Sequence, residues 1–142
     1  MTITNPDMTR YLQTLEEAVE LVLYAIDNGN TGDILVQKAP ACSVGELAQA
    51  LSELFGVTHE YRVIGARHGE KLYETLLTRE EMQCAEDMGR FYRIPADTRN
   101  QNYESYTDKG EAGGAVSEMY KSDYNSNNTT LLTLEQIKQK LL

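Results

Sequence analysis

The chain has 142 residues, of which 41% are hydrophobic and 25% are charged. These proportions suit one globular domain and are too apolar for a wholly disordered chain. Lys and Arg number 13 against 22 Asp and Glu, so the net charge is −9. Such an acidic chain lacks the positive field that nucleic acid or an anionic membrane needs, and we expect neither as a partner. Because the sequence contains no long apolar run and no signal-peptide pattern, we expect a cytoplasmic protein.

Two extended segments and one helix are predicted in the first part of the chain. Residues 2–4 and 10–13 are the extended segments, separated by the turn-forming sequence 5–7. A helix is expected after Thr14, because a hydroxyl there and a carboxylate three residues later form a capping box, and Gly29 supplies the stop. The apolar positions of this helix recur every three or four residues and predict one buried stripe: Leu15, Ala18, Val19, Val22, Leu23 and Ile26.

Strands and helices continue to alternate in the middle of the chain. The mostly apolar run 33–37 predicts a strand that is covered on both faces. A second capping box at Ser43 begins a helix that is expected to end at Gly56. Alternation with short connections is typical of an α/β architecture. The further expected elements are strands at 59–64, 73–77 and 91–94 and a helix at 79–88 capped by Thr78.

The last part of the chain divides into an irregular stretch and a terminal helix. The stretch is polar but contains four tyrosines, whose rings offer surface that burial would favour: Tyr103, Tyr106, Tyr120 and Tyr124. We therefore divide the chain into an α/β portion (1–95), an irregular tyrosine-rich extension (96–130) and a terminal helix (131–142).

The densest polar cluster runs from Arg67 to Lys71 and directly follows a predicted strand. Arg67 can offer a planar fork to two phosphate oxygens, and Glu70 can accept hydrogen bonds from ribose hydroxyls. Gly69 allows the backbone to turn or to approach a ligand closely. Arg10, just ahead of a helix start, is expected to bring a second guanidinium to the same anion. The alternative is a charged surface turn, with Arg10 in a surface ion pair with Asp7.

Several other kinds of site are excluded by the sequence. It contains no GxGxxG or GxxGxxG loop, no Tyr with Lys four positions later, and no nucleophile-elbow sequence. Cys42 and Cys84 have no Cys or His at ligand spacing, so we expect two ordinary thiols and no metal site. The acidic net charge disfavours polyanions but permits one diphosphate, because two close Arg contacts outweigh screened, distant carboxylates.

Five long stretches, taken in order, resemble one family: 6–22, 32–40, 67–82, 92–97 and 124–129. The chain resembles the capsular and O-antigen polysaccharide biosynthesis group of extended short-chain dehydrogenases. These are CapD-type UDP-N-acetylglucosamine 4,6-dehydratase/5-epimerases, often labelled UDP-glucose 4-epimerases. The resemblance is to the C-terminal substrate-binding portion, which implies an α/β fold with an incomplete Rossmann-type sheet and a small α/β lobe.

The resemblance also implies roles for the polar cluster. Arg10 and Arg67 would contact the substrate pyrophosphate and Glu70 the uridine ribose, with three neighbours beside the substrate: His68, Gly69 and Lys71. No catalytic or cofactor-binding residue is implied in this chain. In a complete family member, NAD(P) would support oxidation at C4 of the sugar, loss of water across C5–C6 and return of the hydride at C6.

The leading hypothesis is a fragment, or separately encoded part, that binds a UDP-sugar and is catalytically silent alone. One alternative is a stand-alone protein-interaction module that uses the tyrosine-rich extension. Another is a half-enzyme completed by a separate N-terminal Rossmann chain or by a homo-oligomer. In that case the strand at 33–37 would be unpaired in the isolated chain.

Overall fold

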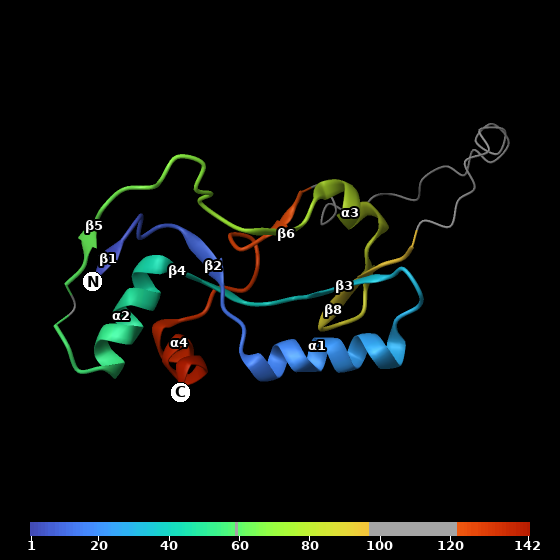
Figure 1. The fold of residues 1–142 in the computed structure, drawn as a ribbon, viewed down its shortest axis with the longest axis horizontal. Coiled ribbons are helices and arrows are strands. Elements are labelled where there is room, and N and C mark those ends of the chain that lie inside the picture. Colours follow the sequence, from blue (N-terminus) through green and yellow to red (C-terminus); the bar gives the residue numbers. More distant parts are fainter. Residues whose placement is uncertain (59, 97–121) are drawn as a thin grey trace, which may run out of the picture.

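The computed structural model describes residues 1–58, 60–96 and 122–142. Within these ranges, four helices and several very short strands alternate along the chain (Figure 1). The helices are α1 (Leu15–Asn28), α2 (Val44–Leu54), α3 (Arg79–Cys84) and α4 (Leu134–Leu141).

Each of the four helices begins at a capping box. The cap hydroxyl accepts a hydrogen bond from the backbone N–H three residues later, and the side chain at that position accepts one from the cap N–H. The caps are Thr14, Ser43, Thr78 and Thr133, and the first three confirm the helix starts predicted from them. The end predicted for α3 is wrong, because Ala85 is extended and the chain then pairs as a strand instead of continuing the helix to residue 88.

The short strands of the described residues form four small sheets. β1 (Thr2–Ile3) pairs in parallel with β5 (Arg62–Val63), and three antiparallel sheets join β2 to β4, β6 to β9, and β3 to β8 to β7. The remaining bounds are β2 (Thr9–Tyr11), β3 (Ile34–Gln37), β4 (Ala41–Ser43), β6 (Thr75–Leu77), β7 (Glu86–Asp87), β8 (Phe91–Ile94) and β9 (Tyr124–Asn125).

The strand expected at 33–37 differs from its prediction in two respects. β3 pairs along its whole length with β8, from Ile34 opposite Ile94 to Gln37 opposite Phe91, so it is not an unpaired strand in the isolated chain. Ile34 is 53% exposed, so the strand is not covered on both faces either. A four-residue apolar run fits an edge strand as well as a central one, and the pairing partner lies far along the chain.

The prediction that 96–130 is irregular throughout is wrong at the end of this stretch. Tyr124 and Asn125 form β9, which pairs with β6. Tyr124 is buried, and its ring lies edge-on to that of Tyr92 at 5.4 Å between centroids. The other three tyrosines of the extension lie outside the described residues.

Among the described residues, two small hydrophobic clusters form the interior. The first lies among β6, α3, β8 and β9 and consists of Leu77, Met82, Tyr92 and Tyr124. The second lies where α2 packs against α4 and consists of Cys42, Ala50 and Ile137. Cys42 is buried and Cys84 exposed, and both are free thiols, as expected.

Helix α1 forms as predicted, but its apolar stripe is not buried. Leu15 is 77% exposed and Ile26 is 72% exposed, and no residue of α1 is fully buried. The periodicity correctly predicts an amphipathic helix, but it carries no information on whether another element covers the apolar face. In the described parts of the chain, no helix has the length and apolarity required to cross a bilayer.

Candidate functional site

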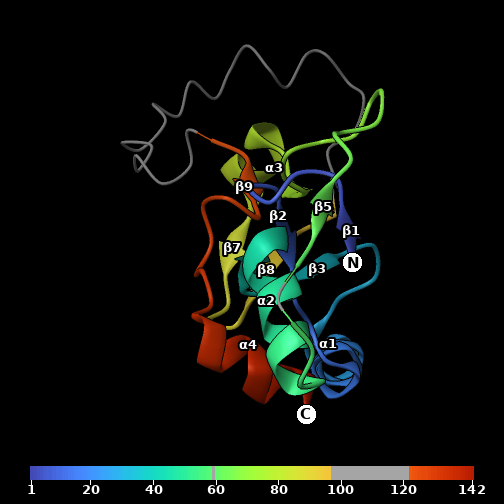
Figure 2. The ribbon, with the colours of Figure 1, turned by 90° about the vertical axis from the view of Figure 1, so that its left-hand side faces the viewer.

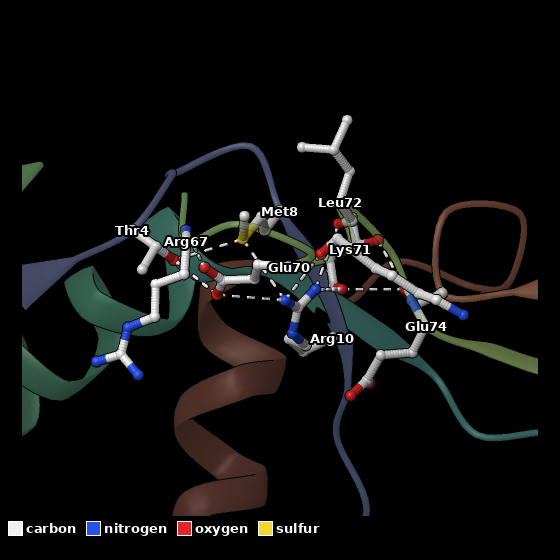
Figure 3. A network of polar contacts seen from close by, with 10 residues as sticks. Thr4, Met8, Arg10, Arg67, Glu70, Lys71, Leu72 and Glu74 are labelled. Atoms are coloured by element: carbon white, nitrogen blue, oxygen red, sulfur yellow. Dashed lines mark hydrogen bonds and ion pairs between the residues drawn. The ribbon is translucent and has the colours of Figure 1, made fainter. Parts of the chain in front are cut away.

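Arg10 lies on β2 and connects this strand to Lys71, at the end of the 67–71 cluster, and to Leu72 (Figure 3). Its Nη1 donates to the carbonyl of Thr9 at 2.8 Å and to that of Leu72 at 3.3 Å. Its Nη2 donates to the carbonyl of Lys71 at 3.0 Å and contacts the sulfur of Met8 at 3.5 Å. Since the Thr9 N–H also donates to Leu72 O at 3.0 Å, residues 71 and 72 are held against β2.

Glu70 is the centre of the cluster. Its carboxylate accepts hydrogen bonds from the Arg67 backbone N–H at 2.9 Å and from the Thr4 hydroxyl at 3.2 Å. Its Oε1 also lies 3.9 Å from Arg10 Nη2. The Arg67 backbone bond, then the Thr4 hydroxyl and the positive charge of Arg10, lower the pKa of Glu70. The carboxylate is therefore ionised at neutral pH.

The turn that carries Glu70 needs its glycine. Gly69 has a φ of +84°, in the left-handed region that L side chains rarely adopt. The turn closes through a hydrogen bond from the Glu70 N–H to the Arg67 carbonyl at 3.0 Å. No heavy atom of the described chain lies within 4 Å of a Cβ placed on Gly69, so open space rather than packing surrounds this position.

The remaining members of the cluster face outward. Arg67, His68 and Lys71 are exposed, and the Arg67 side chain extends away from Glu70 in Figure 3. Within the described ranges, the Arg67 guanidinium makes no hydrogen bond or ion pair. The structure thus places Arg10, Glu70 and Arg67 next to one another, with the carboxylate between the two arginines. Arg10 donates to backbone carbonyls, whereas the Arg67 guanidinium donors have no partner among the described residues.

The ion pair expected as the alternative does not form, because Arg10 pairs with Glu70 and the Asp7 carboxylate is not its partner among the described residues. The Asp7 N–H instead donates to the Asn5 side chain. The charged surface turn that the same alternative predicted does form at residues 67–71. Arg10 holds this turn from β2 through its hydrogen bond to the Lys71 carbonyl.

A hollow of about 310 Å³ lies beside the cluster. It shares Thr9 and Leu72 with the Arg10 network, and its other lining residues are polar or aromatic: Asn5, Asp7, Tyr73 and Asn127. Such a lining suits hydroxyl-rich groups better than anions, because it includes a carboxylate and no cation.

Ser126 is a residue of this region that the sequence reasoning missed. Its hydroxyl is fully buried, donates to the Thr9 carbonyl at 3.0 Å and lies 2.8 Å from the Thr9 hydroxyl. It also accepts from the Glu74 N–H at 2.9 Å. Ser126 thus links its own segment, next to Asn127, to Thr9 on β2 and to Glu74 in the segment after the cluster. Its position within the family-like stretch 124–129 was the available sequence signal.

No group of three or more His, Cys, Asp or Glu side chains suited to a metal ion occurs in the described portions of the chain.

Residues 1–96 match the family model of the polysaccharide biosynthesis protein. The chain belongs to this family. Residues 97–142 match the model of the C-terminal part of polysaccharide biosynthesis proteins. The chain therefore corresponds to a C-terminal portion of a polysaccharide biosynthesis protein, as the resemblance implied.

Relatives in this family are much longer than the chain. A Rickettsia felis protein named UDP-glucose 4-epimerase is 52% identical over 142 residues, which are all of this chain and 40% of that protein. A protein of the same name from Rickettsia akari is 50% identical over the same shares. The chain thus spans about two fifths of the relatives that it matches.

A solved structure shows the same fold. The X-ray structure of Pen from Bacillus thuringiensis superposes with a TM-score of 0.73 at 23% identity, over 98% of this chain and 38% of that one. The α/β fold class expected from the sequence is confirmed.

Proposed function

We propose that this polysaccharide biosynthesis chain supplies the UDP-sugar-binding portion of a nucleotide-sugar 4,6-dehydratase/epimerase, with UDP-N-acetylglucosamine as the substrate. The observation that carries the proposal is the position of Glu70 between Arg67, on the same exposed turn, and Arg10, on β2. A guanidinium binds phosphate oxygens in pairs, and an ionised carboxylate accepts hydrogen bonds from ribose hydroxyls. Two relatives named UDP-glucose 4-epimerase support a nucleotide-sugar ligand.

The two arginines would act differently. Glu70, 3.9 Å from Arg10 Nη2, cancels much of the Arg10 charge, and Arg10 already donates to three carbonyls. Arg10 would therefore hold the turn in shape. Arg67, whose side chain is exposed, would contact the diphosphate. One guanidinium and a phosphate 4 Å apart attract by about 4 kcal/mol at an effective dielectric constant of 20, before desolvation.

The overall negative charge does not oppose this binding. Charges on exposed side chains are screened over roughly 8 Å at physiological salt, so distant carboxylates act weakly on a ligand at this turn. The polar hollow beside Thr9 and Leu72 would receive the sugar, because hydroxyl groups can use its amide and carboxylate oxygens.

This chain would bind and orient the substrate without converting it. Residues 1–142 contain neither a glycine-rich dinucleotide loop nor a Tyr with Lys four positions later. We assign NAD(P) and the acid–base residues to the part of the relatives that this chain does not span. NAD(P), when bound there, supplies the hydride chemistry. Orientation of the sugar is the contribution of this chain.

An NMR titration of the 15N-labelled chain with UDP and UDP-N-acetylglucosamine tests the proposal. We expect shifts at the amides of 67–72 and Thr9, with weak affinity because the rest of the enzyme is absent. Arg67→Met should weaken UDP binding by about tenfold, as expected for loss of a charge-assisted pair. Arg62→Met, which changes an exposed arginine of β5, is the matched control and should bind as the wild type does.

Uridine and inorganic pyrophosphate, titrated separately, divide the ligand into its parts. Pyrophosphate shifts should depend on Arg67, and uridine shifts should depend on Glu70 through Glu70→Gln. Shifts confined to other parts of the chain, or UDP binding that is equal in the wild type and Arg67→Met, would contradict the proposal.

A further inference from the structure

Helix α1 ends at an Asn–Gly pair, Asn28 and Gly29, and the 142 residues contain no other such pair. Asparagine is a chemically labile residue, and a glycine after it has no side chain to hinder its backbone nitrogen from approaching the asparagine Cγ. Figure 2 shows α1 at the margin of the molecule, beside β3. Both residues of the pair are exposed, so water reaches them. The pair is therefore placed for a reaction of the chain with itself.

The atoms that would react are held by the last turn of α1. The Asn28 Nδ2 donates to the Tyr24 carbonyl at 3.1 Å, and the Gly29 N–H donates to the Ala25 carbonyl at 2.9 Å. A Cβ on Gly29 would lie 2.6 Å from the Ala25 carbonyl oxygen, so closure of this turn requires a glycine. The fold thus needs the same residue that makes Asn28 reactive, and it protects Asn28 only while these two hydrogen bonds last.

This last turn is weakly held. No residue of α1 is fully buried, and its ion pairs with other described elements, at Glu17 and Glu20, lie in its first half. Nearer its end, the ring of Tyr24 lies 4.4 Å from that of buried Phe91, measured between centroids. Helix ends with few buried contacts open locally at small cost. We therefore expect the last turn to open while the rest of the chain stays folded.

We propose that Asn28 is a self-modification site, at which opening of the last turn of α1 leads to deamidation. Once both hydrogen bonds break, the Gly29 nitrogen forms a bond to the Asn28 Cγ and gives a cyclic imide. The bond from Cγ to Nδ2 breaks, and Nδ2 leaves as ammonia with the proton that the Gly29 nitrogen gives up. One water molecule then opens the imide at either carbonyl carbon, which yields aspartate or isoaspartate. The reaction consumes one water, releases one ammonia and involves no oxidation or reduction.

Either product weakens the end of the helix. The new carboxylate lies at the negative end of the helix dipole, next to Asp27, and it cannot donate to the Tyr24 carbonyl. Isoaspartate also adds one carbon atom to the main chain ahead of Gly29, which moves the Gly29 N–H away from the Ala25 carbonyl. A modified α1 therefore frays more readily than the unmodified helix.

The neighbouring Asn30 provides a comparison within the same chain. It is exposed like Asn28, but it is followed by Thr31, whose β-branched side chain hinders the approach of its own backbone nitrogen. The Asn30 backbone N–H and side-chain Nδ2 also donate to the Asp33 carboxylate, at 2.9 Å and 3.3 Å. Exposure alone thus predicts reaction at both asparagines, whereas the proposed mechanism predicts it at Asn28 only.

Timed incubation of the purified chain in mildly alkaline buffer tests the proposal. Peptide mass spectrometry locates deamidation, and an isoaspartate-specific methyltransferase detects the isoaspartyl product. We expect conversion at Asn28 and none at Asn30 in the folded chain. In urea, conversion at Asn28 should be at least about tenfold faster, because opening of the last turn no longer limits the reaction. Asn28→Gln keeps the amide but moves its carbonyl carbon one bond further away, and it should stay unmodified.

Two substitutions in α1 test the role of its last turn. Tyr24→Ala removes the contact with Phe91 and should speed conversion in the folded chain, whereas Leu15→Ala, at the exposed start of the same helix, should not. Circular dichroism verifies that both variants are folded; if Tyr24→Ala is not, the comparison of folded and urea-unfolded wild type decides. Absence of conversion at Asn28 in the folded chain by the time the unfolded chain has fully converted would overturn the proposal. Equal rates in the two states, or equal acceleration by both substitutions, would also overturn it.

Discussion

Replacing Arg10 with Met tests whether this side chain holds the turn of the polar cluster against β2. The change keeps most of the apolar stem and removes hydrogen bonds to the carbonyls of Thr9, Lys71 and Leu72. Each such bond contributes about 1 kcal/mol net, and the exposed ion pair with Glu70 adds less than about 1 kcal/mol. The side-chain rotamer entropy that the arginine loses on folding is no longer lost in the variant, which offsets about 2 kcal/mol of this destabilisation. We therefore expect the free energy of unfolding to fall by about 1–2 kcal/mol.

Urea denaturation measures this loss, and hydrogen exchange locates it. The Thr9 amide, which donates to Leu72 O at 3.0 Å, should exchange faster once the turn is released. The Leu12 amide, which donates to Pro40 O at 2.9 Å, should not change. Arg79→Met is the matched control, because that exposed arginine pairs only with its neighbour Glu80 among the described residues, and should cost less than about 0.5 kcal/mol. Equal unfolding free energy and unchanged Thr9 exchange in Arg10→Met would refute the reasoning.

Three further substitutions test the packing around the site. Ser126→Ala should cost about 2–3 kcal/mol in urea denaturation, because it leaves buried polar partners unsatisfied; a loss below about 0.5 kcal/mol would contradict that role. Burial, followed by the charge of Tyr124, raises the pKa of Tyr11, so stability should fall as pH rises above about 10, and Tyr11→Phe should reduce that loss in thermal melts. Burial alone would raise the pKa of Glu17, but the hydrogen bond from Lys140 lowers it. Lys140→Met should therefore destabilise the protein by about 1 kcal/mol at pH 7, and this difference should shrink as the pH falls through the lowered pKa of Glu17. A difference that stays constant while the Glu17 carboxylate is protonated would show that lost packing, and not the charge pair, causes the effect.

The sequence alone determined the features that depend on a few neighbouring residues. Thr14, Ser43 and Thr78 cap the helices predicted from them, because a capping box is complete within four residues. The turn at Gly69 that presents Glu70 is equally local. The family was also accessible from the sequence, since its motifs are long and occur in order.

Only the tertiary structure decided which distant segments meet. Arg10 contacts a carbonyl 61 positions away, and β3 takes a partner strand from beyond α3. Ser126 joins β2 across 117 positions. The same limit applies to α1: a helical period predicts an apolar face, whereas burial of that face depends on what else the chain provides to cover it. Local sequence specifies a conformation at little entropic cost, but contacts across long loops depend on the packing of the whole chain and carry no local pattern.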